Sequence, residues 1–428
     1  MLDLLPPVPT TPLSVPSAMQ SLAPHGFMFA TGIENSAPVV GAEGARTRRD
    51  QLAECGFYTS WREDFALVQE IGCGFLRYGP QLHTTLRAPG RHDWSFADET
   101  FAELRRRGIV PIVDLCHFGV PDWVGDFQNP DFPALFADYA QAFAARFPWV
   151  QLYTPVNEMF ITAVFSAKYG WWNERRHDDR SYVMAIRNIV RANVLAMRAI
   201  LAVRPDAIFI QSESTEHFHP ECPAALPHAE HRNAERFLTL DLNYGRRVCS
   251  AMYEYLMDNG MTREDYHFFL RQDLRRHCVM GNDWYVTNEH LIGGDGHSRW
   301  AGEVFGYDTV TREYHERYRL PVMHTETNMD QGPGGDEAER WLWKQWSGLM
   351  RLRQLGVPML GFTWYSLTDQ VDWDSALREV NRRVNPRGLY DLDRNIRPVG
   401  RAYRRLIAEW GEVLRSQDAC LRLPLAAA

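Results

Sequence analysis

Residues 110–154 carry the pattern that decides the fold. The segment begins with a short apolar run, VPIVDL (110–115), continues with an amphipathic stretch, PALFADYAQAFAARF (133–147), and ends with a second apolar run, VQLYT (150–154). Apolar residues recur at three- and four-residue spacing in the middle stretch, as on one face of a helix. Two apolar strands joined by a helix are typical of a parallel sheet whose two faces are both covered.

The same unit repeats along the chain. Apolar runs occur at 27–33, 74–78, 110–115, 150–154, 207–211, 279–285, 321–325 and 359–364. Helical periodicity occurs between them at 61–71, 97–107, 133–147, 182–203, 234–259, 263–275, 308–318 and 337–355, and again at 400–414. These eight units show no break in composition, and they predict one closed α/β barrel, a single (β/α)8 TIM barrel with loops inserted at its C-terminal face.

We expect three regions along the chain: an extended, proline-rich N-terminal arm at 1–25, the catalytic barrel at 26–420 and a tail at 421–428. The longest insertion, at 213–236, follows the fifth apolar run and is rich in His, Pro and Glu. Its histidines fit no zinc-ligand spacing, so a solvated loop is expected there.

Composition limits the class of protein. The chain has 428 residues, with 46 Lys plus Arg against 54 Asp plus Glu and a formal charge of −8, which argues against a nucleic-acid partner. No apolar stretch is long enough to span a membrane. The first residues lack a basic region followed by an apolar run, and the seven cysteines form no CxxC pair, so we expect a cytoplasmic protein with reduced thiols.

Barrel enzymes carry their chemistry on residues just past the ends of the strands. Two carboxylates are prominent there, Glu158 after the fourth run and Glu326 after the seventh. Those strands lie on opposite sides of the barrel mouth, so the two side chains can face each other. Cleavage of a glycosidic bond needs such a pair, one protonated acid at the leaving oxygen and one ionised carboxylate near the anomeric carbon. Arg77, which ends the second run, is placed to keep Glu326 ionised.

The segments around both carboxylates resemble glycoside hydrolase family 1, the β-glucosidase-like retaining enzymes. Residues 153–158 (YTPVNE) resemble the family's Thr-x-Asn-Glu-Pro acid/base motif, and residues 321–328 (PVMHTETN) resemble its Thr-Glu-Asn-Gly nucleophile strand. The resemblance implies a retaining, exo-acting β-glycosidase that cleaves a terminal β-linked sugar by double displacement. In it Glu158 would be the acid/base and Glu326 the nucleophile.

Further segments match the family in order: FLRY (75–78), LCHF (115–118), GNDWY (281–285) and YSLTDQVDW (365–373). From these matches and from positions at strand ends, the expected substrate contacts are Glu34, Arg77, His117, Asn157, Tyr285, Trp364, Asp372 and Trp373. The family's first-strand glutamine has no clear counterpart here, and Glu34 would take its role, while Asp372 replaces a glutamate. The sugar is therefore not predicted.

Two alternatives stay open from the sequence: a transglycosidase that uses the same residues, and a carbohydrate-binding barrel that has lost catalysis. A Schiff-base aldolase is disfavoured, because the two lysines, Lys168 and Lys344, do not end strands. We expect an oligosaccharide or glycoside substrate, no cofactor, no metal and no membrane partner, and the sequence leaves a homo-oligomer open.

Overall fold

The computed structural model describes residues 26–426, and the surroundings of side chains over 26–414. The predicted arm at 1–25 lies outside the described residues. Helix α15 (Pro398–Ala426) continues past residue 420, where we expected a tail to begin.

Eight parallel strands form a closed barrel: β1 (Met28–Gly32), β4 (Phe75–Arg77), β7 (Val110–Cys116), β8 (Leu152–Val156), β9 (Ile208–Ser214), β11 (Cys278–Asp283), β14 (Val322–Glu326) and β15 (Met359–Trp364). Strand β1 pairs with β4 on one side and with β15 on the other, which closes the ring. Each strand overlaps one predicted apolar run, so the predicted TIM barrel is confirmed.

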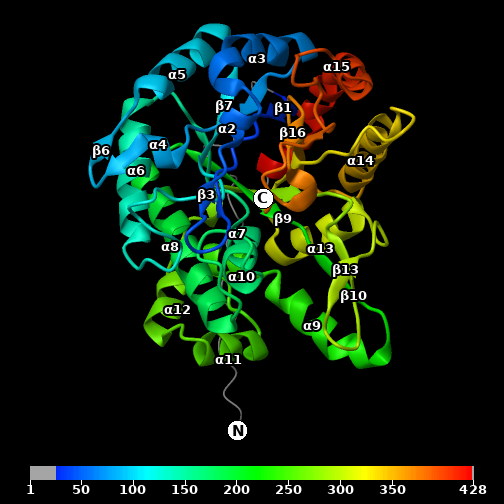
Figure 1. Ribbon diagram of the computed structural model, residues 1–428. Coiled ribbons are helices and arrows are strands. Elements are labelled where there is room, and N and C mark those ends of the chain that lie inside the picture. Colours follow the sequence, from blue (N-terminus) through cyan, green and yellow to red (C-terminus); the bar gives the residue numbers. More distant parts are fainter. Residues whose placement is uncertain (1–25, 427–428) are drawn as a thin grey trace.

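Long helices surround the barrel (Figure 1): α3 (Phe57–Ile71), α5 (Ser95–Arg107), α6 (Phe132–Arg146), α8 (Asp179–Val203), α13 (Tyr307–Tyr318), α14 (Glu337–Gln354) and α15. Helix α5 shows why such segments begin and end where they do. Three arginines occupy its last turn, where they complement the helix dipole, and Gly108 ends it with a φ of 70°, a conformation that glycine adopts without strain.

The prediction of one helix at 234–259 is wrong. The chain forms α9 (Leu226–Glu235), α10 (Leu238–Asn243) and α11 (Ser250–Asp258) instead. Gly245, with a φ of 66°, turns the chain after α10. The next predicted helix, at 263–275, is shorter than expected and forms α12 (Arg263–Leu270).

The insertion at 213–236 was expected to be a solvated loop, and this expectation is also wrong. Strand β10 (His217–Pro220) pairs with β12 (Glu289–Ile292), which pairs with β13 (Ser298–Trp300). The histidines help to order this small sheet, since His219 Nε2 lies 2.7 Å from the buried carboxylate of Glu289. Strand pairing and a small apolar cluster that includes Phe218 and Ile292 thus give this polar insertion regular structure.

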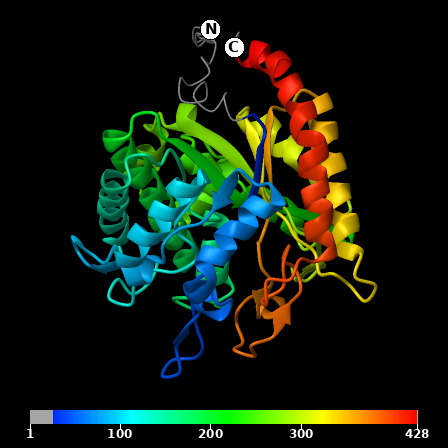
Figure 2. The same cartoon turned by 90° about the horizontal axis from the view of Figure 1, so that it is seen from above.

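The connections that follow β1 and β15 project from the same side of the barrel (Figure 2). They contain the β2–β3 hairpin (Val39–Val40 and Thr47–Arg48) and the β16–β17 pair (Gln370–Val371 and Val384–Asn385). Because they continue from strand ends, they lie around the C-terminal mouth, as expected for the inserted loops.

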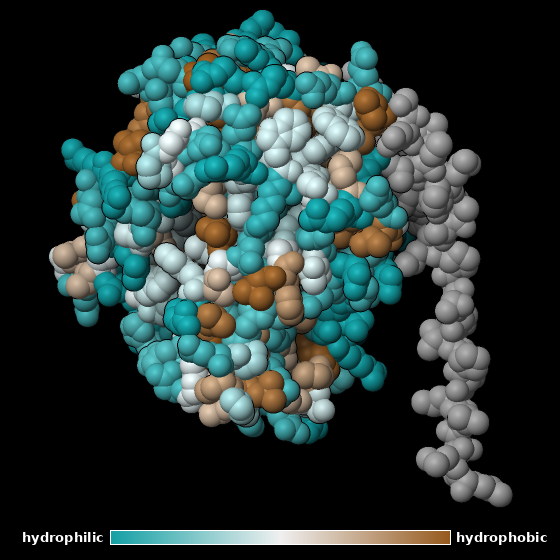
Figure 3. Space-filling view, turned by 90° about the vertical axis from the view of Figure 1, so that its right-hand side faces the viewer, coloured by the Kyte–Doolittle hydropathy of each residue, from teal (hydrophilic) through white to brown (hydrophobic). Residues whose placement is uncertain are grey.

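The outer surface is mixed in character. The face in Figure 3 is mainly hydrophilic, with separate small hydrophobic areas. None of the described helices combines the length and the apolar composition that crossing a bilayer requires.

The barrel has two cores. One lies inside the ring of strands and consists of small and medium apolar side chains such as Ile112, Ile208 and Met323. The other lies between the strands and the outer helices. Because apolar side chains fill the ring, the polar residues that end the strands gather at its C-terminal mouth.

Leu352 and Leu355, at the end of α14, provide a matched test of the outer core. Leu352 is fully buried, whereas Leu355 is 62% exposed. We expect Leu352→Ala to destabilise the protein by about 2–5 kcal/mol, because it leaves a cavity, and Leu355→Ala to change stability by less than about 0.5 kcal/mol. Thermal unfolding of both variants checks this. Equal melting temperatures would contradict the packing described here.

Candidate active site

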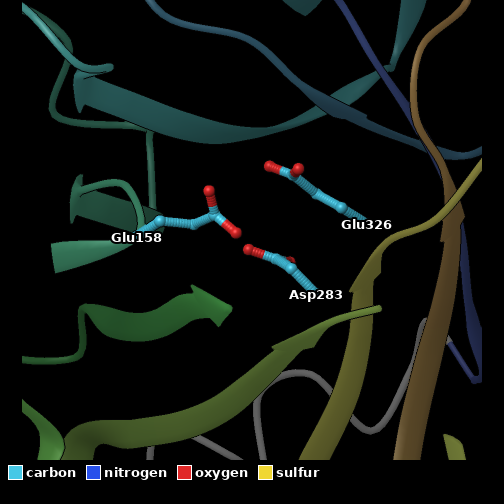
Figure 4. Close-up of side chains that lie close together, drawn as sticks. All are labelled: Glu158, Asp283 and Glu326. Carbon is cyan, nitrogen blue, oxygen red and sulfur yellow. The ribbon is translucent and has the colours of Figure 1, made fainter. Parts of the chain in front are cut away.

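Three carboxyl groups meet at the mouth of the barrel (Figure 4). Glu158 follows β8, Asp283 ends β11 and Glu326 ends β14. One carboxyl oxygen from each residue lies within 4.8 Å of the others. The structure thus brings the two predicted glutamates face to face and adds a third acid that we did not predict.

Glu326 is held by two donors. Arg77 Nη1 donates to Oε1, and the Tyr285 hydroxyl donates to Oε2 at 2.6 Å. The Glu326 side chain is nearly buried, with 4% exposure. A guanidinium and a phenol thus hold the two oxygens of this carboxyl in place.

Arg77 is itself fixed by a ring of hydrogen bonds. Its Nε and Nη2 lie 3.3 and 3.1 Å from Asp114 Oδ1, and Nη2 also donates to Asn157. Asp114 lies 3.2 Å from His117 Nδ1, and His117 Nε2 lies 3.0 Å from the Asn157 amide nitrogen. Burial raises the pKa of Asp114, but the Arg77 charge and the His117 hydrogen bond outweigh it, so this pKa lies below its usual value.

Glu158 has the opposite environment. Among the described residues, no side chain or backbone amide donates a hydrogen bond to its carboxyl group. Burial is the main reason why its pKa lies well above the usual value, and the nearby charges of Asp283 and Glu326 add to the effect. Glu158 is therefore suited to hold a proton, while Glu326 lies against the positive charge of Arg77.

The backbone aims Glu158 into the mouth. Its φ is 38°, in the left-handed region that residues other than glycine seldom adopt. Its N–H donates to the Ser212 carbonyl at 2.9 Å. Helix α7 (Met159–Ala163) begins at the next residue, and Glu213 accepts the Phe160 N–H at 3.0 Å. The strained turn is thus supported by residues of β9.

Glu34 and Trp373 line the same region. Glu34 is buried and accepts hydrogen bonds of 2.9 Å from the Ser36 N–H and from Gln370 Nε2. Burial raises its pKa. The indole N–H of Trp373 is buried and has no partner among the described residues. An unpaired buried donor is costly, so Trp373 is suited to donate to a bound ligand.

Trp364 and Asp372 do not join this cluster. Trp364 belongs to the outer core, and its Nε1 donates to the Arg387 carbonyl at 2.9 Å. The Asp372 carboxylate accepts from Arg49 Nη2 at 2.9 Å and from the backbone N–H groups of residues 381–383 at 2.7–3.0 Å. Both residues are structural, because their polar atoms are satisfied by the protein itself.

Tyr365 was missed by the sequence analysis. Its ring stacks on His117, with centroids 6.1 Å apart, and lies beneath the Arg77 guanidinium at 5.5 Å. Gly32 leaves room for the ring, since a Cβ there would lie 2.2 Å from it. The alternation of side chains along a strand could have identified Tyr365. Adjacent strand residues point to opposite faces, and Trp364 faces the outer core. Asp283 was missed although it lies within the quoted GNDWY segment.

The three acids are also the one group among the described residues whose spacing could hold a cation. Two of the three acids already have partners within the protein, however. Arg77 places a positive charge on Glu326, and Ser212 Oγ lies 2.8 and 2.7 Å from the two Asp283 oxygens. The arrangement fits the sharing of protons better than a set of metal ligands.

Asp372→Ala tests the structural role of this residue. We expect it to destabilise the protein by about 3–5 kcal/mol, because it leaves the buried Arg49 guanidinium without Asp372 and frees three backbone donors. Thermal unfolding measures the effect, with the exposed Asp336→Ala as a control for loss of an aspartate. An unchanged melting temperature together with lost substrate affinity would instead make Asp372 a substrate contact.

Known proteins resemble the chain in both sequence and fold. It is 23% identical to β-glucosidase A of Thermotoga maritima over 368 residues, which cover 74% of this chain and 79% of that protein. It is 20% identical to aryl-phospho-β-D-glucosidase BglA of Bacillus subtilis over 414 residues, which cover 83% and 84%. A solved family 1 β-glucosidase from Thermotoga maritima superimposes with a TM-score of 0.75 over 90% of this chain and 97% of that one, at 17% identity.

The family model of glycosyl hydrolase family 1 matches residues 43–289, which is more than half of the chain and includes Glu158. Together with the barrel and the paired carboxyls at its mouth, this match identifies the chain as a glycoside hydrolase that belongs to glycosyl hydrolase family 1.

Proposed function

We propose that this protein is a retaining, exo-acting β-glycosidase in which Glu326 is the nucleophile and Glu158 the acid/base. One observation supports the assignment most strongly: the two facing carboxyls have opposite surroundings. Glu326 accepts hydrogen bonds from Arg77 and Tyr285, whereas the Glu158 carboxyl lacks a donor among the described residues. A glycosidase of this kind needs two carboxyls in different surroundings, one to donate a proton and one to attack.

In the first step, Glu326 attacks the anomeric carbon while Glu158 gives its proton to the leaving glycosidic oxygen. This forms a glycosyl ester on Glu326 and removes that group's negative charge. Glu158, now ionised, then takes a proton from a water molecule that attacks the same carbon. The sugar is released, Glu326 is ionised again and Glu158 is protonated again, so the cycle closes.

The spacing supports retention of configuration. The nearest carboxyl oxygens of Glu158 and Glu326 lie within 4.8 Å of each other. Retaining enzymes hold the two groups about 5–5.5 Å apart, whereas inverting enzymes need roughly 6.5–9.5 Å to admit a water molecule. The shorter separation suits direct attack by Glu326.

We also propose which groups bind the sugar. The Asn157 amide nitrogen donates one hydrogen to His117 and has a second for a sugar hydroxyl. The unpaired Trp373 N–H is a further donor. Each Glu34 oxygen accepts one protein hydrogen bond and keeps a lone pair for a sugar hydroxyl. His117, whose two ring nitrogens pair with Asp114 and Asn157, orients Asn157. The exposed fractions of Glu158 and Glu326, 7% and 4%, support action on a chain end, since an open groove would expose both.

Transfer to an acceptor other than water would use the same residues. Product analysis with an alcohol acceptor separates transfer from hydrolysis. The aldolase alternative has no support in the structure, since Lys168 and Lys344 pair with Glu235 and Glu303. A panel of aryl β-glycosides tests which glycone is accepted. The panel includes phosphorylated sugars, because one relative is named an aryl-phospho-β-D-glucosidase.

Glu326→Gln removes the proposed nucleophile. We expect turnover of an activated aryl β-glycoside to fall by at least about 10³-fold, while the melting temperature stays close to that of the wild type. Steady-state kinetics and thermal unfolding check both points, with Glu339→Gln on α14 as the control. Undiminished turnover in Glu326→Gln would refute the nucleophile assignment.

Glu158→Gln removes the proposed proton donor. We expect the rate on substrates with poor leaving groups to fall by about 10²–10⁴-fold, and substrates with good leaving groups to be less affected at the bond-breaking step. Azide should partly restore the rate and give a β-glycosyl azide, because it attacks without help from a base. If the kinetics do not depend on the leaving group and azide has no effect, Glu158 is not the acid/base.

A further inference from the structure

Asp283 has no task in the double displacement, although it lies in the centre of the site. Its side chain is fully buried at the end of β11. Figure 4 shows it pointing toward both glutamates, and one of its oxygens lies within 4.8 Å of an oxygen of each. A third acid in this position affects the protonation of the other two.

The contact with Ser212 is informative. Ser212 Oγ lies 2.8 Å from Asp283 Oδ1 and 2.7 Å from Oδ2. A hydroxyl carries one proton, so it can donate a well-aligned hydrogen bond to only one of these two oxygens. A proton on Asp283 would supply the other, with Ser212 Oγ as the acceptor. The local geometry therefore accommodates a protonated Asp283.

The charges around Asp283 point the same way. Arg77 is the one cation among the described groups that act on it, and Arg77 is already paired with Asp114 and Glu326. The groups that face Asp283 or the adjacent Glu158 from the surrounding elements are Arg77 of β4, Glu158 after β8, Ser212 and Glu213 of β9, Glu216 beyond it, Tyr285 after β11, and Thr325 and Glu326 of β14. Most of them are acids or hydroxyls, so no positive charge is left for Asp283 and Glu158.

Two uncompensated carboxylates cannot both ionise cheaply in a buried site. Burial, followed by the charge of Glu326, raises the pKa of Asp283 to about 8. The charge of Asp283 is in turn the largest cause, after burial, of the raised pKa of Glu158. The two groups are expected to titrate as a pair.

We propose that Asp283 is a positioning residue of this reaction, whose nearby carboxyl keeps Glu158 in its acid form to higher pH than burial alone would. This proposal rests on the proposed function of Glu158. Asp283 acts only through Glu158 and forms no bond to the sugar. Once one group of this pair has ionised, its negative charge opposes ionisation of the other.

Asp283→Asn tests the proposal. It keeps the size of the side chain and removes its charge, so Glu158 should lose its proton at lower pH. We expect the alkaline limb of the kcat/KM profile to move down by about one pH unit or more. Asp283→Glu, which keeps a carboxyl, should move the limb back toward its wild-type position. An unchanged alkaline limb in Asp283→Asn would overturn the proposal.

A second measurement needs no turnover. The raised pKa means that native protein holds a proton that unfolded protein has released, so wild-type stability falls as pH rises from about 4 to 8. Asp283→Asn lacks this group, and its melting temperature relative to wild type should rise steadily over that range. A difference that does not depend on pH would overturn the proposal. If Asp283→Asn does not fold, Asp283→Ser replaces it with the same expectations.

The two measurements separate this proposal from the proposed function. Wild-type protein that hydrolyses no β-glycoside would refute the function, while the melting series would still report on Asp283. An active wild type whose Asp283→Asn variant shows neither shift would refute only the role of Asp283. Both series are run with EDTA and then with added Mg²⁺ or Ca²⁺. A shift caused by the cation alone would overturn the proposed role of Asp283, because the acids would then bind metal.

Discussion

The Arg77 guanidinium is buried at the end of β4 and donates to side chains on or just after β7, β8 and β14. Its partners Asp114, Asn157 and Glu326 occupy three different strands, so one cation ties a large part of the barrel mouth together. The cost of burying this charge is offset only while those partners stay in place. Closure of the barrel and the geometry of the acids therefore depend on each other.

This single cation also creates the difference between the acids. It pairs with Glu326 and leaves Glu158 and Asp283 without a compensating charge, although all three are buried within a few ångströms. Asp114 does not compete for a proton, because Arg77 and His117 lower its pKa. Neighbouring carboxyl groups thus lie in different electrostatic surroundings, as glycosidic cleavage requires.

Position in a motif did not always predict the role of a residue. Asp372 lies where a sugar contact was expected, but Arg49 and the backbone of 381–383 occupy its oxygens. Tyr365 rather than Trp364 stacks over His117, because adjacent residues at the end of β15 face opposite sides. Two of the predicted contacts, Trp364 and Asp372, thus have their polar atoms bound within the protein.

The sequence by itself determined the eight strands, the barrel and the two glutamates, because apolar periodicity and strand-end position are local properties. It also placed Arg77 beside Glu326. Only the tertiary structure decided that the insertion forms a sheet, that Asp372 belongs to an ion pair, and that Asp283 meets Glu158 and Glu326. Each of these depends on contacts between distant segments, and the strength of such contacts is set by burial and distance, which the order of residues does not show.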